Sequence, residues 1–298
     1  MSPTPIAPPY QLTQTRHGLM LVNPNDIYMG QSFLRYGECC QREIQVLLQL
    51  LSHPQSLPGI AIEVGSNMGV HTIPIARELA CQNRQMLALE PQPVIFQQLC
   101  ANLALNGLMN VTALPYACGA EPGQLAFQTP DYRAPGNFGG TAMSSPPGAA
   151  LSHSVPSHTL DSLVPGEAVS LLKIDAEGHE LRVLKGAQLL LSRSRPILYV
   201  ENDRIEESQR LIEWLFEQGY RLWWHITQAF NPGNFLHAER NIYGDLCFIN
   251  MLGIHPAHNM TIDGLPEITD PSNHPLKPAS EDAPQTPELA HTPYAALR

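Results

Sequence analysis

AIEVGSNMGVHT, residues 61–72, is an apolar run that ends in a glycine-rich turn and leads into a helical pattern. Glycines let a backbone pass close to a ligand, and the exposed amides at the start of a helix attract a carboxylate or a phosphate. The pattern therefore predicts a strand and a helix joined at an anion-binding turn. A tight connection without any ligand would give the same pattern.

Apolar runs on both sides of this stretch continue the alternation of strand and helix. They occupy residues 59–64, 86–89, 111–114, 171–174 and 197–200. Helical patterns follow most of these runs, and the clearest one covers residues 92–105. This alternation is typical of βαβ units and of a mainly parallel sheet.

Two further strands are expected in YRLWWHI, residues 220–226, and in GDLCFINML, residues 244–252. Their direct link suits an antiparallel pair at one sheet edge, because parallel neighbours need a crossover of a dozen or more residues. We therefore predict a doubly wound α/β fold, Rossmann-like, with seven strands in a mainly parallel sheet.

The distribution of polar residues divides the chain into three segments. Residues 1–57 form an N-terminal extension with an amphipathic helix at 38–51 that could cover the site, and residues 58–254 form the core. The Pro-rich tail at 255–298 has no apolar periodicity and is expected to be disordered, because it cannot offset its ordering entropy. Residues 131–158 contain Gly and Pro throughout and predict a long loop beside the site.

Composition restricts the class of partner. A net charge of -10 offers no basic surface for phosphate backbones, so nucleic acid is not an expected substrate. The six scattered cysteines indicate a reducing compartment, and the N-terminus lacks the features of a signal peptide. No apolar stretch is long enough to span a membrane, so we expect a cytoplasmic protein. The acidic charge favours a small or neutral acceptor.

Glu90 ends the second core strand, in MLALEP. A carboxylate at a strand tip next to the glycine-rich turn can accept hydrogen bonds from both hydroxyls of a ribose, which indicates an adenosine ligand. A dinucleotide-binding protein would also have an acidic residue there. Its GxGxxG fingerprint is missing, so an NAD-dependent oxidoreductase remains the second interpretation.

Several segments together resemble the FkbM-type family of S-adenosylmethionine (SAM)-dependent methyltransferases. The similar segments are NPNDIYMGQSFLRYGECCQREI, AIEVGSNMGVHT, LALEPQPVIFQQLCANLALNG, TLDSL and LLKIDAEGHELRVLKGA. The resemblance extends over residues 18–251 and implies a class I SAM methyltransferase, EC 2.1.1.-, with SAM as cofactor. At position 63 the family more often has Asp, whereas this sequence has Glu63.

The resemblance also implies a pose for the methyl donor. The methionine part would lie over the 65–69 turn, the ribose on Glu90, and the adenine near the end of the third strand. The cofactor-binding residues expected from this pose are Glu63, Gly65, Ser66, Asn67, Gly69, Thr72, Glu90, Pro91, Tyr116 and Ala117.

KIDAEGHE places a dense group of charged residues at the carboxyl end of the fourth strand, where doubly wound sheets bind ligands. Methyl transfer to a hydroxyl benefits from a nearby base, and Asp175, Glu177 and His179 are the candidate catalytic residues. The structural alternative is that Asp175 caps the next helix and that the glutamates favour its positive end. The oxygen-rich cluster suits Mg²⁺, but no spacing dictates a metal ligand, and none is assigned.

Glu201 and Asn202 follow the fifth strand and could orient an acceptor hydroxyl. The expected function is SAM-dependent O-methylation of a hydroxyl on a sugar, a glycan or a small natural product. N-methylation, a catalytically silent SAM-binding module and a glycan-binding module remain as alternatives. The sequence is compatible with a homo-oligomer but specifies none.

Overall fold

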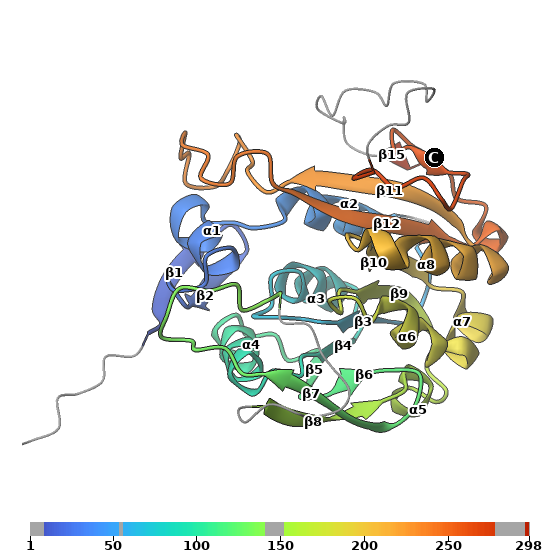
Figure 1. The fold of residues 1–298 in the computed structure, drawn as a ribbon, viewed down its shortest axis with the longest axis horizontal. Coiled ribbons are helices and arrows are strands. Elements are labelled where there is room, and N and C mark those ends of the chain that lie inside the picture. Colours follow the sequence, from blue (N-terminus) through green and yellow to red (C-terminus); the bar gives the residue numbers. More distant parts are fainter. Residues whose placement is uncertain (1–8, 54–55, 141–151, 278–295, 298) are drawn as a thin grey trace, which may run out of the picture.

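The computed structural model describes residues 9–53, 56–140, 152–277 and 296–297. An eight-stranded sheet forms its centre, in the order β14-β11-β12-β10-β9-β3-β4-β5 (Figure 1). In that order the strands are β14 (Glu267–Ile268), β11 (Arg221–Gln228), β12 (Cys247–Ile254), β10 (Ile197–Glu201), β9 (Val169–Ile174), β3 (Ile60–Val64), β4 (Met86–Leu89) and β5 (Val111–Leu114).

The five strands from β10 to β5 are all parallel, whereas β12 is antiparallel to both β10 and β11. The doubly wound, mainly parallel sheet is thus confirmed. The antiparallel pair is also present, with β12 inside the sheet and β11 nearer the edge. The strand number was wrong by one, because the two-residue strand β14 pairs with β11 and adds an eighth.

Strand order reverses between β3 and β9. The chain proceeds from β3 through β4 to β5 on one side, and from β9 to β10 on the other. The connections diverge at such a point and leave a crevice beyond the carboxyl ends of the strands, where open α/β sheets bind ligands.

Helices cover both faces of the sheet, because alternate residues of each buried strand point to opposite sides. Ala61 of β3 and Leu171 of β9 belong to one hydrophobic cluster, whereas their neighbours Ile62 and Leu172 belong to the other. Figure 1 shows α2 (Gln41–Ser52), α3 (Thr72–Cys81) and α4 (Pro93–Leu105) on one side and α6 (Glu180–Lys185), α7 (Gln188–Ser194) and α8 (Ile205–Glu217) on the other. The short helix α5 (Leu160–Leu163) contributes to the second cluster.

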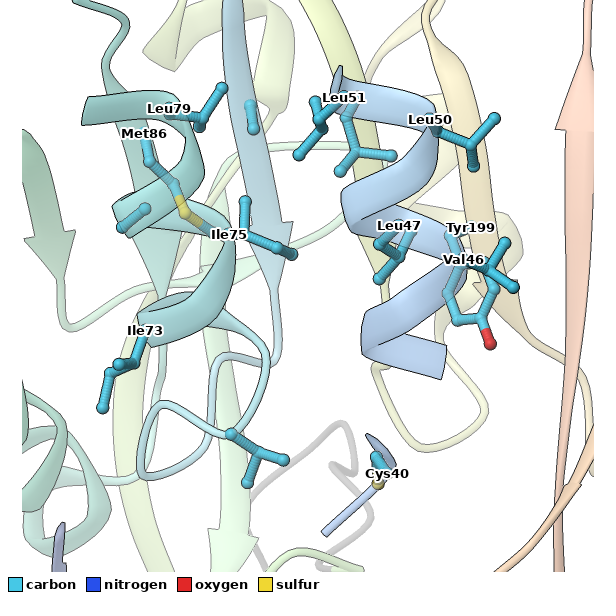
Figure 2. Close-up of a cluster of buried hydrophobic side chains, with 14 of the residues drawn as sticks. Cys40, Val46, Leu47, Leu50, Leu51, Ile73, Ile75, Leu79, Met86 and Tyr199 are labelled. Carbon is cyan, nitrogen blue, oxygen red and sulfur yellow. The ribbon is translucent and has the colours of Figure 1, made fainter. Parts of the chain in front are cut away.

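Helix α2 was expected to cover the site, but most of it is part of the core. Figure 2 shows Leu47 and Leu50 of α2 in the same cluster as Ile75 of α3 and Tyr199 of β10. Only the start of α2 reaches the ligand side of the sheet. Before it come the hairpin β1 (Gln11–Thr15) and β2 (Gly18–Val22) and the helix α1 (Met29–Tyr36).

The segment at 131–158 is only partly a loop. Its last residues form β8 (Ser152–His158), which pairs with β7 (Gly123–Gln128) and β6 (Ala117–Cys118) in a second sheet. Residues 141–151 lie outside the described part of the chain. Among the described residues, no helix is long and apolar enough to cross a membrane.

The predicted boundary of the disordered tail at residue 255 needs correction. Residues 255–277 contain the 3₁₀ helix η1 (Pro256–His258), β13 (Ile262–Asp263) and β14. Strand β13 pairs with β15 (Ala296–Leu297), and residues 278–295 are not described. The reason is burial of isolated residues: Ile268 and His274 are 5% and 2% exposed, although no periodic pattern surrounds them.

His274 provides a test of this corrected boundary. Its Nε2 lies 2.9 Å from the carbonyl oxygen of Asn202, and its ring meets Trp224 edge to face at 5.3 Å. We expect His274→Ala to lower the free energy of unfolding by about 1–3 kcal/mol, because it removes a buried hydrogen bond and ring contact. Urea unfolding measures this, with Leu276→Ala at a 54% exposed position as the control. Equal stability of both variants would contradict the packing of this segment.

Candidate active site

A cavity of about 480 Å³ opens beyond the carboxyl ends of β3, β4, β9 and β10, at the reversal of strand order. Its volume falls in the range of small-ligand sites. Most of the site residues predicted from sequence line it, among them Gly65, Asn67, Glu90, Tyr116, Asp175 and Glu177, whereas Glu63, Gly69 and Thr72 are outside the lining.

Gly65 forms the closest approach between β3 and the segment after β9. Its φ of +81° is in the left-handed region, and a Cβ at this position would collide with the carbonyl oxygen of Asp175. Glycine is therefore required for both reasons. Gly69 has a different role, because a Cβ there would lie 3.2 Å from Leu99 of α4, so this glycine allows helix packing.

The amides of the glycine-rich turn are already used inside the protein. Gly65 and Ser66 donate to the carbonyl oxygen of Leu89, and Gly69 donates to that of Ser66. Asn67 donates to the carboxylate of Glu90 at 2.9 Å, and Met68 donates to the side chain of Asn67. The glycine-rich turn, which was expected to bind an anion, therefore forms a floor of the cavity. Its backbone amides from residue 65 to 69 donate to acceptors within the protein.

Glu90 projects into the cavity from the end of β4 and is only 4% exposed. One carboxylate oxygen accepts from Asn67 and the other accepts from the backbone of Gln92 at 2.8 Å. Burial raises the pKa of Glu90 to about 7 against the effect of these bonds. A carboxylate in this state can accept further hydrogen bonds from a ligand on the cavity side.

Pro91, Tyr116 and Ala117 also line the cavity. The ring of Tyr116 is half-buried and lies 4.6 Å from that of His158 on β8. Gln92 also lines this part and donates to the carbonyl oxygen of Phe138. The loop after Asp131 thus lies beside the site, and its residues Asn137, Gly139 and Gly140 belong to the lining.

Glu63 and Thr72 do not line the cavity in the described part of the chain. Both are buried, and Thr72 donates to Oε2 of Glu63 at 2.6 Å. Oε1 of Glu63 lies 3.4 Å from Nζ of Lys173, which also lies 3.3 Å from Oδ2 of Asp175. Burial alone would lower the pKa of Lys173, but the carboxylates of Asp175 and Glu63 raise it above its ordinary value. Glu63 therefore holds a buried ammonium group, and no contact with the cavity is seen.

Asp175, Glu177 and His179 all line the cavity. Asp175 is one-third exposed and held by Lys173, whereas Glu177 accepts from Arg204 at 2.6 Å. Burial and then the charge of Asp175 raise the pKa of Glu177 to about 7. His179 directly precedes α6 and occupies its N-cap position.

The structure does not support a helix-capping role for Asp175, but it gives Glu180 of the same segment a structural role. Asp175 does not cap α6, because His179 occupies the cap position. Glu180 instead accepts from the backbone amides of Ala176 and Gly178, each at 3.0 Å, and fixes the 175–179 turn. Asp175 and Glu177 therefore keep their side chains on the cavity side.

Glu201 and Asn202 separate at the end of β10. Glu201 lines the cavity, and burial followed by the charges of Asp175 and Glu177 raises its pKa well above the ordinary value. Asn202 is 3% exposed and donates to the sulfur of Met251, so its side chain serves the core. One carboxylate oxygen from each of Asp175, Glu177 and Glu201 lies within 4.8 Å of the others.

Sequence reasoning missed the pair formed by His71 and Glu43. His71 Nε2 lies 3.1 Å from Oε2 of Glu43, and Thr227 of β11 donates to the other oxygen of Glu43 at 2.9 Å. Both residues are buried in the cavity wall. The only signal in the sequence was the place of His71 directly after the glycine-rich turn, since its partner is 28 residues away.

A family model for the methyltransferase FkbM domain matches residues 63–222, which are more than half of the chain. The hexuronic acid methyltransferase AglP of Haloferax volcanii is 29% identical over 145 residues, which are 48% of this chain and 55% of AglP. The chain thus spans about half the length of this curated relative. The family match gives no support to the NAD-dependent alternative.

Solved structures with a similar arrangement include methyltransferases from two bacteria. The methyltransferase FkbM from Methylobacillus flagellatus KT has a TM-score of 0.44 and 14% identity, over 69% of this chain and 47% of that chain. A putative O-methyltransferase from Klebsiella pneumoniae has a TM-score of 0.44 and 20% identity, over 76% and 86% of the two chains.

We expect binding of S-adenosylhomocysteine (SAH) to depend on pH through Glu90, the ribose-binding residue predicted from sequence, and calorimetric titration can measure this dependence. Ribose hydroxyls donate more strongly to a charged carboxylate than to a neutral one, and the pKa of Glu90 is about 7. The affinity is therefore fully present above this pKa and falls as the pH drops below it, by up to about tenfold per pH unit.

The matched variant is Glu90→Gln, whose amide does not titrate. We expect it to bind SAH roughly 10- to 100-fold more weakly than the wild type, with little change between about pH 6 and pH 8. A wild-type affinity that stays constant over this range would remove Glu90 from the ribose site.

Proposed function

This chain belongs to the FkbM family of SAM-dependent methyltransferases, and from that membership we propose that it methylates a hydroxyl group of a sugar or glycan. The proposal rests on one observation: a single cavity has carboxylates at two separate places, one suited to the methyl donor and one to the acceptor. Glu90 lies at the end of β4, and Asp175 and Glu177 follow β9, two strands away.

The donor half is formed by residues that directly follow β3 and β4 and by residues at the start of β6. We assign the ribose to Glu90, the methionine part to the floor at Gly65, Ser66 and Asn67, and the adenine to Tyr116 and Ala117. When bound there, SAM supplies a methyl group on a positively charged sulfur. Glu90 itself is buried, and burial strengthens the hydrogen bonds that its carboxylate makes to a ligand.

The acceptor half is formed by the segment after β9. Lys173 fixes the carboxylate of Asp175, which leaves its exposed side to accept a hydrogen bond from an acceptor hydroxyl. A positioned carboxylate of this kind holds the oxygen for an in-line attack and takes up its proton. Glu177 is oriented by Arg204 and adds a second acceptor beside it.

The charge of the cavity favours a neutral, hydroxyl-rich acceptor. Asp175 and Asp203 line it together with the glutamates Glu177 and Glu201, whose raised pKa values limit their negative charge, and an acidic acceptor would add a further negative charge to this group. AglP acts by name on a hexuronic acid, which supports a sugar as the acceptor class. The acidic lining argues for a neutral sugar ring in this protein.

The proposed function is tested with methyl-labelled SAM and a panel of neutral sugars, hexuronic acids and amines. Label on a sugar hydroxyl is the expected result, with neutral sugars preferred. Label on amines alone, or SAM binding without any transfer across the panel, would contradict the proposal.

Asp175→Asn separates binding from chemistry. The amide keeps the shape but takes up no proton, so we expect turnover to fall by about 10²- to 10⁴-fold while the affinity for SAH changes less than about twofold. Glu206→Gln, on the exposed side of α8, is the charge-matched control. Unchanged turnover in Asp175→Asn would show that another group takes the proton.

A further inference from the structure

We propose that Asp175, Glu177 and Glu201 bind a divalent cation of the Mg²⁺ or Mn²⁺ class at the acceptor side of the cavity. Binding of the cation is a property of these residues alone. Its use in catalysis rests on the proposed function.

The fold itself brings the three carboxylates together. Strands β9 and β10 are parallel neighbours, and their register pairs Ile174 with Val200. The next residues are Asp175, directly after β9, and Glu201, the last residue of β10, and they therefore lie side by side at this edge of the sheet. A turn with positive φ at Glu177 (52°) and Gly178 (92°) then directs the chain back, and Glu177 joins the pair.

The spacing of the oxygens suits a small hard cation. One oxygen from each carboxylate lies within 4.8 Å of the other two. Opposite ligands of an octahedral Mg²⁺ are about 4.2 Å apart and neighbouring ligands about 3 Å, from metal–oxygen distances of about 2.1 Å. Small rotations of these side chains would give three positions of the octahedron and leave the others for water or acceptor oxygens.

Glu201 provides a second, independent observation. Its Oε2 is buried and has no hydrogen-bond partner among the residues that the structure describes. Lys173 contacts Asp175, and Arg204 contacts Glu177. Among the described residues, Glu201 is the carboxylate of this group that has no ion pair with a basic side chain. A buried carboxylate oxygen without a donor is costly, and a bound cation would supply the missing interaction.

A second group of potential ligands, formed by Cys40, Glu43 and His71, is less suited to a cation. Both oxygens of Glu43 already have partners, in His71 and Thr227. Binding a metal there would break these buried bonds, whereas binding at Glu201 breaks none. This contrast favours the group at the ends of β9 and β10.

A cation in this position would act on the acceptor. It would neutralise carboxylates that repel one another, and a hydroxyl oxygen bound to it would lose its proton more readily. Asp175 and Glu177 would then orient the hydroxyl through the cation as well as by direct hydrogen bonds.

The test uses the whole protein, treated with a chelator and dialysed, without SAM or acceptor. Titration with Mn²⁺, followed by electron paramagnetic resonance and calorimetry, should give one saturable site with a Kd at or below about 1 mM, from which Mg²⁺ displaces Mn²⁺. Absence of saturable binding up to about 10 mM Mn²⁺ would overturn the proposal.

Three variants locate the site. Glu201→Gln and Asp175→Asn should each weaken Mn²⁺ binding at least tenfold, and retained SAH binding shows that the variants are folded. Asp203→Asn removes a charge from the same cavity lining but lies outside the group, so it should weaken binding less than about threefold. Equal weakening by Asp203→Asn, or wild-type binding by Glu201→Gln, would overturn the site.

Paramagnetic broadening in the wild type gives the location without any variant. Bound Mn²⁺ should broaden the amide signals of residues 175–179 and 201–203 before those near Glu90, and the reverse order would contradict the proposal. Methylation that persists in chelator with no Mn²⁺ binding would leave the proposed function standing and reject the cation site. Mn²⁺ binding without methylation would leave the cation site standing and reject the proposed function.

Discussion

The buried ammonium group of Lys173 holds the two halves of the site together. It is 2% exposed, and its neighbours are Glu63 on β3 and Asp175 after β9, at 3.4 and 3.3 Å. Loss of one partner from a buried ion pair leaves an uncompensated charge and costs about 3–5 kcal/mol. Lys173 and Glu63 lie where the strand order reverses. The ammonium group that stabilises the centre of the sheet through Glu63 therefore also fixes the carboxylate of Asp175 at the cavity.

Much of the core could be predicted from sequence because buried parallel strands are short apolar runs between helices. The runs at 86–89 and 111–114 coincide with β4 and β5, and that at 59–64 exceeds β3 by one residue. The eighth strand could not be predicted, since β14 has two residues and depends on its pairing with β11, 44 to 46 positions earlier. The segment from 255 to 277 was likewise misjudged, because single buried residues such as His274 give no periodic signal.

The site was predictable in position but only partly in detail. Strand ends indicate which residues reach the crevice, and Glu90, Asp175 and Glu177 all lie there. Strand ends do not tell which carboxylate faces the cavity and which serves the interior. Glu63 and Glu90 both lie near the ends of similar apolar runs, yet Lys173 and Thr72 bind Glu63 inside the protein. That difference depends on a lysine 110 residues away, which no local pattern reveals.

The link between Glu43 and Thr227 has a consequence for how the protein is made. These residues are 184 positions apart, and Arg16 and Asn231 are joined in a similar way through Glu38. When β3, β4 and β9 have left the ribosome, the β11 and β12 side of the cavity wall has therefore not yet been synthesised. Contacts over such separations form late. The nascent chain thus completes this wall of the cavity only after residues 227–250 have been synthesised.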